Sequence, residues 1–267
     1  MRLVLAIGLA ATLAAGPLRA CEGAQTKVEE VYPTATALPE NLLRFYIYFS
    51  APMGRDDIAP AVDLLDAQGR VVEGVFLTNR FDLWSADRTR LTLLLNPGRV
   101  KTGLAANLAL GRALVAGETY TLQISRFARD AKGCPLARPH RVTFQAVPAD
   151  VSTPAPQDWK ITVPGVGTRT PLTVELDGPV DHLSLAYRLR VIGPDGAPVP
   201  GRIGLDAGET RWQFTPRAPW PGSPHRITID PQLEDLAGNR PGALFDQPMD
   251  APRAAWSPSL DWSPTRR

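Results

Sequence analysis

The sequence predicts an all-β protein made of two sandwich domains in tandem, and three observations support this prediction. Proline is in excess, with 27 residues in a chain of 267, and proline interrupts helices but is tolerated in turns and at strand edges. Short segments alternate apolar and polar residues with a period of two, as half-buried strands do. The two halves of the chain also repeat one another. No later segment has the pattern of a long amphipathic helix, although a short helical turn near Gly103–Leu110 is compatible with the sequence.

The first 20 residues have the features of a signal peptide. Arg2 provides a short positive region, and residues 3–15 form an unbroken apolar run that Gly16 and Pro17 end. This run is shorter than the ~20 apolar residues that a membrane-spanning helix needs. Cleavage after Ala20 would remove this leader, and an uncleaved N-terminal anchor is the alternative. We therefore expect the mature chain to be exported to the periplasm, the outer envelope or the extracellular space.

The mature chain is electrically neutral. Without the leader it has 247 residues, and its formal charge falls from +2 to zero because the leader contains two basic residues and no acidic one. A neutral chain has no global electrostatic reason to bind nucleic acid or an anionic membrane. Its length suits two domains of ~100–150 residues each. The sequence therefore predicts no nucleic-acid partner and no membrane span.

Two cysteines, Cys21 and Cys134, allow more than one interpretation. A disulfide between them fits the even count and an oxidising destination. Alternatively, Leu18-Arg19-Ala20-Cys21 resembles a lipoprotein box, in which the thiol is acylated and anchors the protein, although Arg19 stands where a small or apolar residue is usual. Two unpaired thiols are the remaining possibility. Two distant cysteines without a partner at ligand spacing do not form a zinc site.

The repeat defines the expected domains. Matching positions in the first and second halves are Gly117, Tyr120, Asp130 and Gly133 with Gly222, His225, Asp235 and Gly238, at a constant offset of 105. Further upstream, the matching pairs are Gly69 with Gly196 and Gly74 with Gly201, at an offset of 127. The difference between the offsets indicates a 22-residue insertion in the first half, between residues 75 and 116. We expect an N-terminal extension (21–38), domain 1 (39–147), a proline-rich linker (148–158), domain 2 (159–250) and a C-terminal tail (251–267).

Two motifs carry a resemblance to a known family. A strand ends in the corner Phe49-Ser50-Ala51-Pro52-Met53, and the turn Asp235-Leu236-Ala237-Gly238-Asn239 precedes a closing strand. The chain thus resembles tandem bacterial immunoglobulin-like domains of the SbsA type, which implies two immunoglobulin-like β-sandwiches. The first domain departs from the pattern, because Cys134 takes the Asn position of its turn.

Three further segments are similar to those of a two-domain group of exported bacterial proteins without an assigned function. They are Asp87–Leu94, Pro97–Lys101 and Gly208–Trp212. The resemblance implies a fold but no particular chemistry, because this architecture supports many functions.

The Asp-x-x-Gly turns themselves have a structural interpretation. The Asp carboxylate can accept backbone N–H bonds from the following residues, and glycine supplies a positive φ. We therefore interpret five residues as structural: Asp130, Gly133, Asp235, Gly238 and Asn239.

No catalytic residue, cofactor or metal ligand is expected. The histidines are His140, His182 and His225, and no Gly-x-Ser-x-Gly elbow or phosphate-binding glycine pattern accompanies them. The acidic pair Asp56-Asp57 lacks the spacing of a calcium loop. Whether calcium is bound between the domains stays open.

Two places are candidate interaction sites. The insertion carries Arg99, Lys101 and Arg112, and arginine makes bidentate contacts with an acidic protein or an anionic glycan. The alternative is that these side chains cap carbonyls or pair with acids of their own domain. Trp256 and Trp262 lie in the tail, past the last expected strand, where they could bind a partner or dock on their own domain.

The function that the sequence favours is that of a non-catalytic protein of the cell envelope or the extracellular space. It would be a structural or interaction module that binds a protein or an envelope polymer. The alternative is a carbohydrate-binding or small-ligand-binding protein that uses exposed tryptophans, since aromatic faces stack on apolar rings. A hydrolase on an unfamiliar scaffold is a third and weaker candidate.

Overall fold

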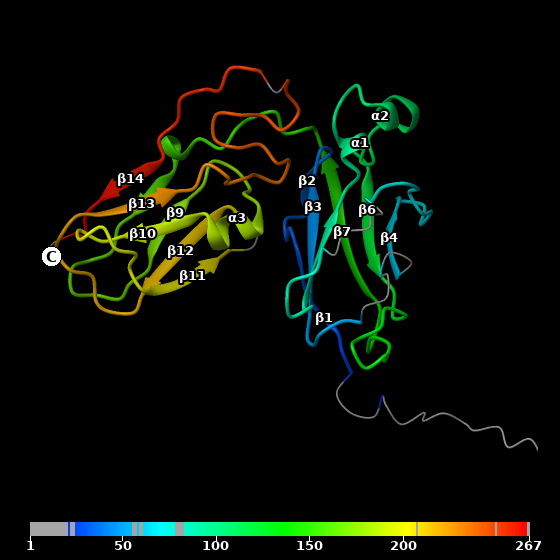
Figure 1. Cartoon of the computed structure of the whole chain (residues 1–267), viewed down its shortest axis with the longest axis horizontal. Helices are drawn as coiled ribbons and strands as arrows, with labels where there is room; N and C mark the ends of the chain where they lie inside the picture. The colour runs from blue at the N-terminus through cyan, green and yellow to red at the C-terminus, as the bar shows by residue number, and fades with distance from the viewer. Residues whose placement is uncertain are drawn as a thin grey trace, which may run out of the picture.

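The computed structural model describes residue 21 and residues 25–54, 58, 61–77, 83–206, 208–248 and 250–265. Its strands form two β-sandwiches side by side, one from each half of the chain (Figure 1). The predicted signal peptide, residues 1–20, lies outside the described residues. No helix in the described ranges is long and apolar enough to cross a membrane.

The first sandwich has one sheet of three strands and one of four. Its strands are β1 (Val28–Tyr32), β2 (Ala37–Pro39), β3 (Arg44–Phe49), β4 (Val62–Leu65), β5 (Arg90–Leu94), β6 (Thr119–Ile124) and β7 (His140–Val147). The strand orders are β1-β3-β5 and β2-β7-β6-β4. The pairs are antiparallel, except that β2 and β7 run parallel.

The second sandwich also has one sheet of four strands and one of three, in a different order. Its strands are β8 (Lys160–Thr162), β9 (Leu172–Glu175), β10 (Leu189–Ile192), β11 (Gly201–Leu205), β12 (Arg211–Pro216), β13 (His225–Ile229) and β14 (Ser259–Trp262). The orders are β11-β12-β9-β8 and β10-β13-β14. Within the second sandwich, the first, second, fourth and fifth strands thus share one sheet and the third, sixth and seventh the other, which is the immunoglobulin order. The first sandwich differs in that its second strand, β2, pairs with β7 in the sheet opposite β1. The predicted all-β fold of two immunoglobulin-like sandwiches is confirmed.

Short helices complete the fold. The insertion of the first half contains α1 (Pro97–Val100) and α2 (Ala105–Leu110), and α2 lies where the helical turn was expected. Asn96 caps α1 by accepting the backbone N–H of Gly98 at 2.9 Å, and Pro97 starts the helix. The second half has α3 (His182–Tyr187), a helix that the sequence did not predict, and a 3₁₀ turn, η2 (Pro156–Asp158), in the linker.

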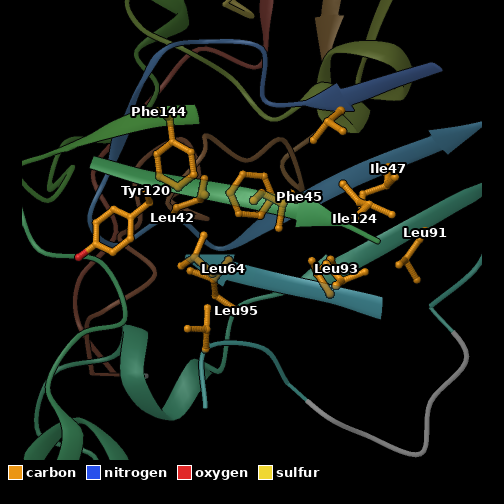
Figure 2. Packing of buried hydrophobic residues seen from close by; sticks show 14 of the residues in the cluster. Leu42, Phe45, Ile47, Leu64, Leu91, Leu93, Leu95, Tyr120, Ile124 and Phe144 are labelled. Atoms are coloured by element: carbon orange, nitrogen blue, oxygen red, sulfur yellow. The ribbon is translucent and has the colours of Figure 1, made fainter. Parts of the chain in front are cut away.

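Each sandwich has its own apolar core. In the first, Phe45 and Ile47 of β3 face Phe144 of β7, with 5.7 Å between the ring centroids of Phe45 and Phe144 (Figure 2). Fully burying side chains of this size contributes about 1.5–3 kcal/mol each. The second core centres on Trp212 and Trp220, which are 0% and 1% exposed. The alternation of the sequence therefore identifies the inward faces of these strands.

The end of the second sandwich differs from the expected boundaries. Domain 2 was expected to end at residue 250 and to be followed by a tail, but β14 lies within residues 251–267 and pairs with β13. It occupies the position that β7 holds beside β6 in the first sandwich. The expected boundary was wrong because residues 240–248 run out towards the first sandwich, and residues 250–258 lead back to the sheet (Figure 1).

Candidate functional site

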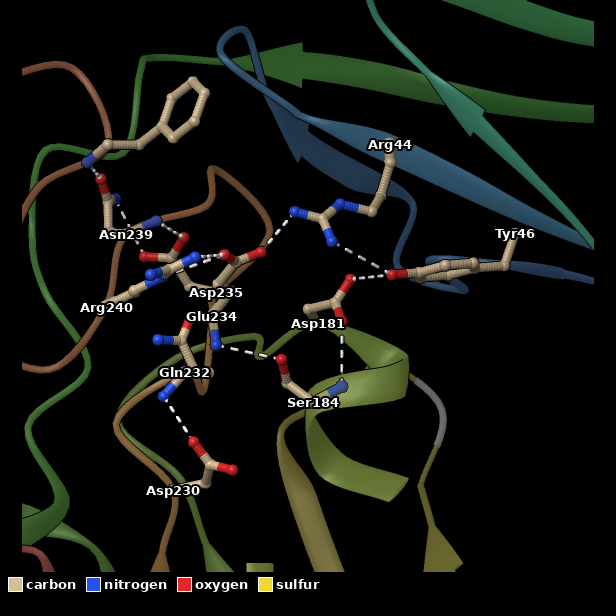
Figure 3. A network of polar contacts seen from close by, with 11 residues as sticks. Arg44, Tyr46, Asp181, Ser184, Asp230, Gln232, Glu234, Asp235, Asn239 and Arg240 are labelled. Carbon is tan, nitrogen blue, oxygen red and sulfur yellow. Dashed lines mark hydrogen bonds and ion pairs between the residues drawn. The ribbon is translucent and has the colours of Figure 1, made fainter. Parts of the chain in front are cut away.

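A cluster of polar side chains lies where the two sandwiches meet, and we call it the junction (Figure 3). Arg44 and Tyr46 come from β3, and Asp181, Glu234 and Arg240 come from the second half. Residues 44 and 46 alternate with the core residues of β3, so they project from the opposite face of the strand. Tyr46 is nevertheless only 2% exposed. The outer face of β3 is therefore covered by the second sandwich and not by solvent.

Asp181 links α3 to the first sandwich. Its Oδ1 caps the helix by accepting the backbone N–H of Ser184 at 2.9 Å, and its Oδ2 accepts the hydroxyl of Tyr46 at 2.8 Å. Burial raises the pKa of the Asp181 carboxyl, while the nearby Arg44 charge lowers it. Burial and the Asp181 charge also raise the pKa of Tyr46. The Asp181 carboxylate thus both caps α3 and links this helix to the first sandwich.

Glu234 is held from both sides. It forms ion pairs with Arg44 of the first sandwich and, at 2.7 Å, with Arg240 of its own half. Its backbone N–H donates to the hydroxyl of Ser184 at 3.0 Å. The Glu234 side chain is 13% exposed and that of Arg44 is 20% exposed, so this pair is largely shielded from water. Such pairs are hard to break, because one partner would remain charged and desolvated.

The Asp-x-x-Gly turn of the second half lies beside this ion pair. Asp235 Oδ1 accepts the backbone N–H groups of Ala237 and Asn239, each at 2.8 Å. Gly238 has a φ of +80°, and a Cβ there would lie 2.7 Å from Leu43 of the first sandwich. The turn thus requires glycine, and the approach of the Leu43 side chain leaves little room for a Cβ.

The matching turn of the first half makes similar contacts away from the junction. Asp130 Oδ1 accepts the backbone N–H groups of Lys132 and Cys134, each at 2.9 Å, and Oδ2 accepts the hydroxyl of Thr26 at 2.8 Å. Gly133 has a φ of +78°, and a Cβ there would meet no described atom within 4 Å. These contacts are those of a structural turn, and the second turn differs in that it also touches the other sandwich.

A buried glutamate forms a second link between the halves. Glu209 is 0% exposed and has a φ of +53°, which is unusual for a residue other than glycine. Its carboxylate accepts the backbone N–H of Thr34 at 3.0 Å and the Thr34 hydroxyl at 2.8 Å. The same hydroxyl accepts the backbone N–H of Gly208 at 2.7 Å. Burial raises the pKa of Glu209, and the Thr34 hydrogen bonds oppose that rise.

Aromatic packing closes the junction around His182. Its ring stacks on Tyr32 with 3.6 Å between centroids and meets Tyr48 edge-on at 5.7 Å. Burial, followed by the charge of Arg90, lowers the pKa of His182 to about 4. Its contacts are therefore those of a neutral packing residue.

The other two histidines also have packing or strand positions. His225 stacks on Trp262 at 5.0 Å, and His140 begins β7. In the described part of the chain, no group of three or more His, Cys, Asp or Glu side chains converges as for a metal ion. The acidic pair at residues 56 and 57 lies outside that part.

The three basic candidate residues of the insertion are engaged within the protein. Arg99 is 5% exposed and donates to the carbonyls of Glu73, Gly111 and Arg112 at 2.6, 3.0 and 3.0 Å. Arg99 therefore holds the insertion together, as the carbonyl-capping alternative predicts, and does not face a partner.

The two other candidate side chains point to neighbouring parts of the chain. Lys101 Nζ lies 4.4 Å from the ring centroid of Phe245, and Arg112 lies 3.5 Å from Glu40. Lys101 thus contributes to the contact between the halves.

The tryptophans lie in the cores or at their margins. Trp159, Trp212, Trp220 and Trp262 are buried, and Trp84 and Trp256 are half-buried. Trp262 belongs to β14 and packs edge-on against Trp220 at 5.1 Å. The expectation that Trp262 lies beyond the last strand was wrong. The carbohydrate-binding alternative needs exposed tryptophan rings, and all six tryptophans are buried or half-buried.

The structure joins Cys21 and Cys134 in a disulfide, with 5.5 Å between their Cα atoms. Cys134 belongs to the turn around Asp130. The bridge therefore ties Cys21 to the Asp-x-x-Gly turn of the first sandwich.

The junction was not predicted as a site, although the position of Glu209 in the repeat could have indicated it. Arg88 and Glu209 are the two residues other than glycine with a positive φ among the described residues, and both precede a Thr-Arg pair that leads into β5 or β12. They occupy equivalent positions of the two sandwiches. Alignment of residues 87–91 with residues 208–212 places Glu209 opposite Arg88, so the two halves carry opposite charges at this position.

Comparisons with known proteins assign no family. No family model matches the chain, and no curated protein matches it. Among solved structures, native alpha-2-macroglobulin from Escherichia coli, spanning domains MG0-NIE-MG1, is similar with a TM-score of 0.30 and 12% identity, over 91% of this chain and 72% of that chain. Rst D1-D2 gives a TM-score of 0.25 and 9% identity, over 91% and 100%. The BSP domain of a biofilm associated protein gives a TM-score of 0.25 and 12% identity, over 77% of this chain and 26% of that chain. At these scores the fold assignment rests on the strand order of the chain itself.

Proposed function

We propose that this chain is an exported, non-catalytic interaction module of the cell envelope, in which two sandwiches act as one rigid body that binds a protein or a polymer. The junction is the observation that carries the proposal. Linked domains normally move relative to one another unless their interface is extensive. Here the interface contains buried charges, and moving the domains apart would leave those charges without partners.

Several kinds of contact support this rigidity. The backbone N–H of Leu43 donates to the carbonyl of Leu236 at 2.9 Å, which links the backbones of the two sandwiches directly. Asn41 and Asp150 exchange two hydrogen bonds, at 2.8 and 2.9 Å, where the linker begins. Leu236 also belongs to the buried core of the first sandwich. A rigid pair holds the loops and strand edges of both sandwiches in a fixed geometry, which favours a partner that touches both.

Small-angle X-ray scattering of the mature protein tests the rigidity. We expect the wild-type curve to fit a single arrangement of the sandwiches. The double variant Arg44→Met/Tyr46→Phe should need an ensemble of arrangements, while Arg190→Met, on the exposed face of β10, should scatter like the wild type. A wild-type curve that itself requires a broad ensemble would contradict the proposal.

Export is tested separately on the full chain. The protein produced in a bacterial host should be recovered outside the cytoplasm with its N-terminus at Cys21. A soluble cytoplasmic product that retains residues 1–20 would contradict this part of the proposal.

A further inference from the structure

Three arginines line one hollow on the second sandwich, away from the junction. The hollow has a volume of about 610 Å³ and lies at one end of the β11-β12 hairpin. Its lining residues are Arg169, Pro200, Gly201, Arg202, Thr215, Pro216 and Arg217. We call it the arginine groove. Its volume is within the ~300–1,000 Å³ of ligand-binding clefts.

The backbone of the groove is fixed by the sandwich core. Gly201 starts β11, and a Cβ at this position would lie 2.3 Å from the Phe214 ring and 2.6 Å from the carbonyl of Thr215. Only glycine therefore allows β11 to pair closely with β12 here. The backbone N–H of Arg217 donates to the carbonyl of Pro200 at 2.8 Å, which holds the two strand ends together.

The third arginine is positioned by a buried tryptophan. Trp220 donates its backbone N–H to the carbonyl of Thr168 at 2.9 Å and its indole N–H to the carbonyl of Thr170 at 2.8 Å. These two bonds fix the residues on either side of Arg169. The three arginines therefore project from a preorganised backbone, which reduces the entropy cost of binding a ligand.

The charges of the groove are not neutralised by the described parts of the chain. Elsewhere on this sandwich, Arg188 pairs with Asp230 at 2.9 Å and Arg211 pairs with Glu175 at 2.7 Å. Within the described ranges, Arg169, Arg202 and Arg217 make no ion pair and no side-chain hydrogen bond, and no acid lines the groove. Three arginines that line one hollow without a carboxylate among its described lining residues favour an anionic ligand.

We infer that the arginine groove binds a sugar chain that carries oxyanions, either carboxylates or phosphates. Guanidinium groups bind both bidentately, and the exposed Pro200 offers apolar surface to the sugar rings between the anionic groups. An acidic peptide fits less well, because a peptide paired along the edge of β11 would meet only one charged residue of that strand, Arg202. The inference rests on the proposed function, since it takes the partner to be an envelope polymer.

Isothermal titration with defined oligosaccharides tests the inference on the mature protein. We expect tetragalacturonate, which carries carboxylates, or a phosphomannan oligosaccharide, which carries phosphates, to bind, and the one that binds identifies the oxyanion. Rising salt should weaken the affinity. Each of Arg169→Gln, Arg202→Gln and Arg217→Gln should weaken it by about tenfold, as the loss of one charge-assisted hydrogen bond predicts, and the triple variant should abolish it.

The controls distinguish binding at the arginine groove from attraction by positive charge anywhere on the protein. Arg190→Gln, on β10 of the opposite sheet, removes the same charge and should bind like the wild type, and melting curves should show that the groove variants remain folded. Failure of both anionic oligosaccharides to bind would overturn the inference, as would unchanged binding by the folded triple variant. Equal affinity for inorganic phosphate, neutral maltotetraose or a Glu-rich peptide would also overturn it. None of these outcomes alters the scattering test of the rigid junction.

Discussion

The hydroxyl of Tyr46 in the first sandwich donates a hydrogen bond to the carboxylate of Asp181 in the second, at 2.8 Å, and both side chains are buried. This single contact joins a strand residue to the N-cap of a helix in the other domain. Because the Asp181 carboxylate is shielded from water, losing this hydrogen bond would leave it without one of its buried partners. The contact therefore stabilises the association of the two sandwiches.

Removing this hydroxyl should destabilise the protein. Tyr46→Phe keeps the ring but leaves Asp181 without one buried partner, and we expect a loss of about 1–3 kcal/mol in the free energy of unfolding. Chemical denaturation measures the change. Tyr187→Phe is the matched control, because Tyr187 is 63% exposed, and equal effects of the two substitutions would contradict the importance of the contact.

Breaking the Arg44–Glu234 ion pair should cost more. Arg44→Met leaves Glu234 shielded from water with fewer positive neighbours, and we expect a loss on the order of 3 kcal/mol. A double-mutant cycle with Glu234→Gln should show strong coupling, since the second change removes the stranded charge. The exposed pair of Arg226 and Asp261 provides the comparison, and a cycle there should give less than about 1 kcal/mol.

His182 should make stability depend on pH. Its pKa in the folded protein is lowered from 6.5 to about 4, so the unfolded chain takes up a proton first as the pH falls. The stability that the neutral His182 ring contributes is therefore fully present above pH 6.5 and is lost as the pH falls towards 4. Asp235 acts in the opposite sense, because burial raises its pKa from 3.8 to about 7.

Comparison of the wild type with His182→Gln isolates the histidine contribution. Both proteins keep Asp235, so the difference in unfolding free energy between them should shrink as the pH is lowered through that window. Denaturation curves at several pH values measure it. A difference that is independent of pH would show that His182 does not titrate between the two states as its burial implies.

The two Asp-x-x-Gly turns should differ in their sensitivity. Asp130→Ala and Asp235→Ala each leave backbone donors unpaired, and we expect each to lower stability by about 1–2 kcal/mol. Gly133→Ala is strained by its positive φ alone, whereas Gly238→Ala also places a methyl group against Leu43. Gly238→Ala should therefore lower the melting temperature more than Gly133→Ala, and the reverse order would contradict the close approach at the second turn.

The cysteine bridge should stabilise the first sandwich substantially. It spans 113 residues, and the chain-entropy model gives about 4–5 kcal/mol for a loop of this length. Cys21→Ser/Cys134→Ser should unfold at lower denaturant concentration than the wild type. Intact-mass measurement with thiol labelling checks the bridge itself, because a diacylglycerol mass on Cys21 with a freely alkylated Cys134 would establish the lipoprotein interpretation.

Much of the fold could be predicted because each strand has a local signature. The alternation of Tyr120, Leu122 and Ile124 in β6, for example, matches their burial. The repeat at an offset of 105 also matches the structure, since Met53 pairs with Asp130 as Val180 pairs with Asp235. Period-two patterns report which residues face a core, and that information is contained in a few neighbouring residues.

The junction could not be predicted in the same way. Tyr46 is a polar-tipped residue at a position that would face water in an isolated sandwich, and its partner Asp181 lies 135 residues away. Nothing local distinguishes a tyrosine that faces solvent from one that faces another domain. For the same reason Arg99 was a candidate for a partner, whereas it binds carbonyls that only the folded chain brings together.

The core of the first sandwich contains a residue from the other half of the chain. Leu236 is 5% exposed within that core, and Phe245 packs against it. A gene fragment that stops in the linker therefore encodes a first sandwich with missing packing, while one that starts there encodes a second sandwich with apolar side chains in water. Domain shuffling during evolution, and any expression of separate halves, would have to carry both sandwiches together for either to keep its native surface.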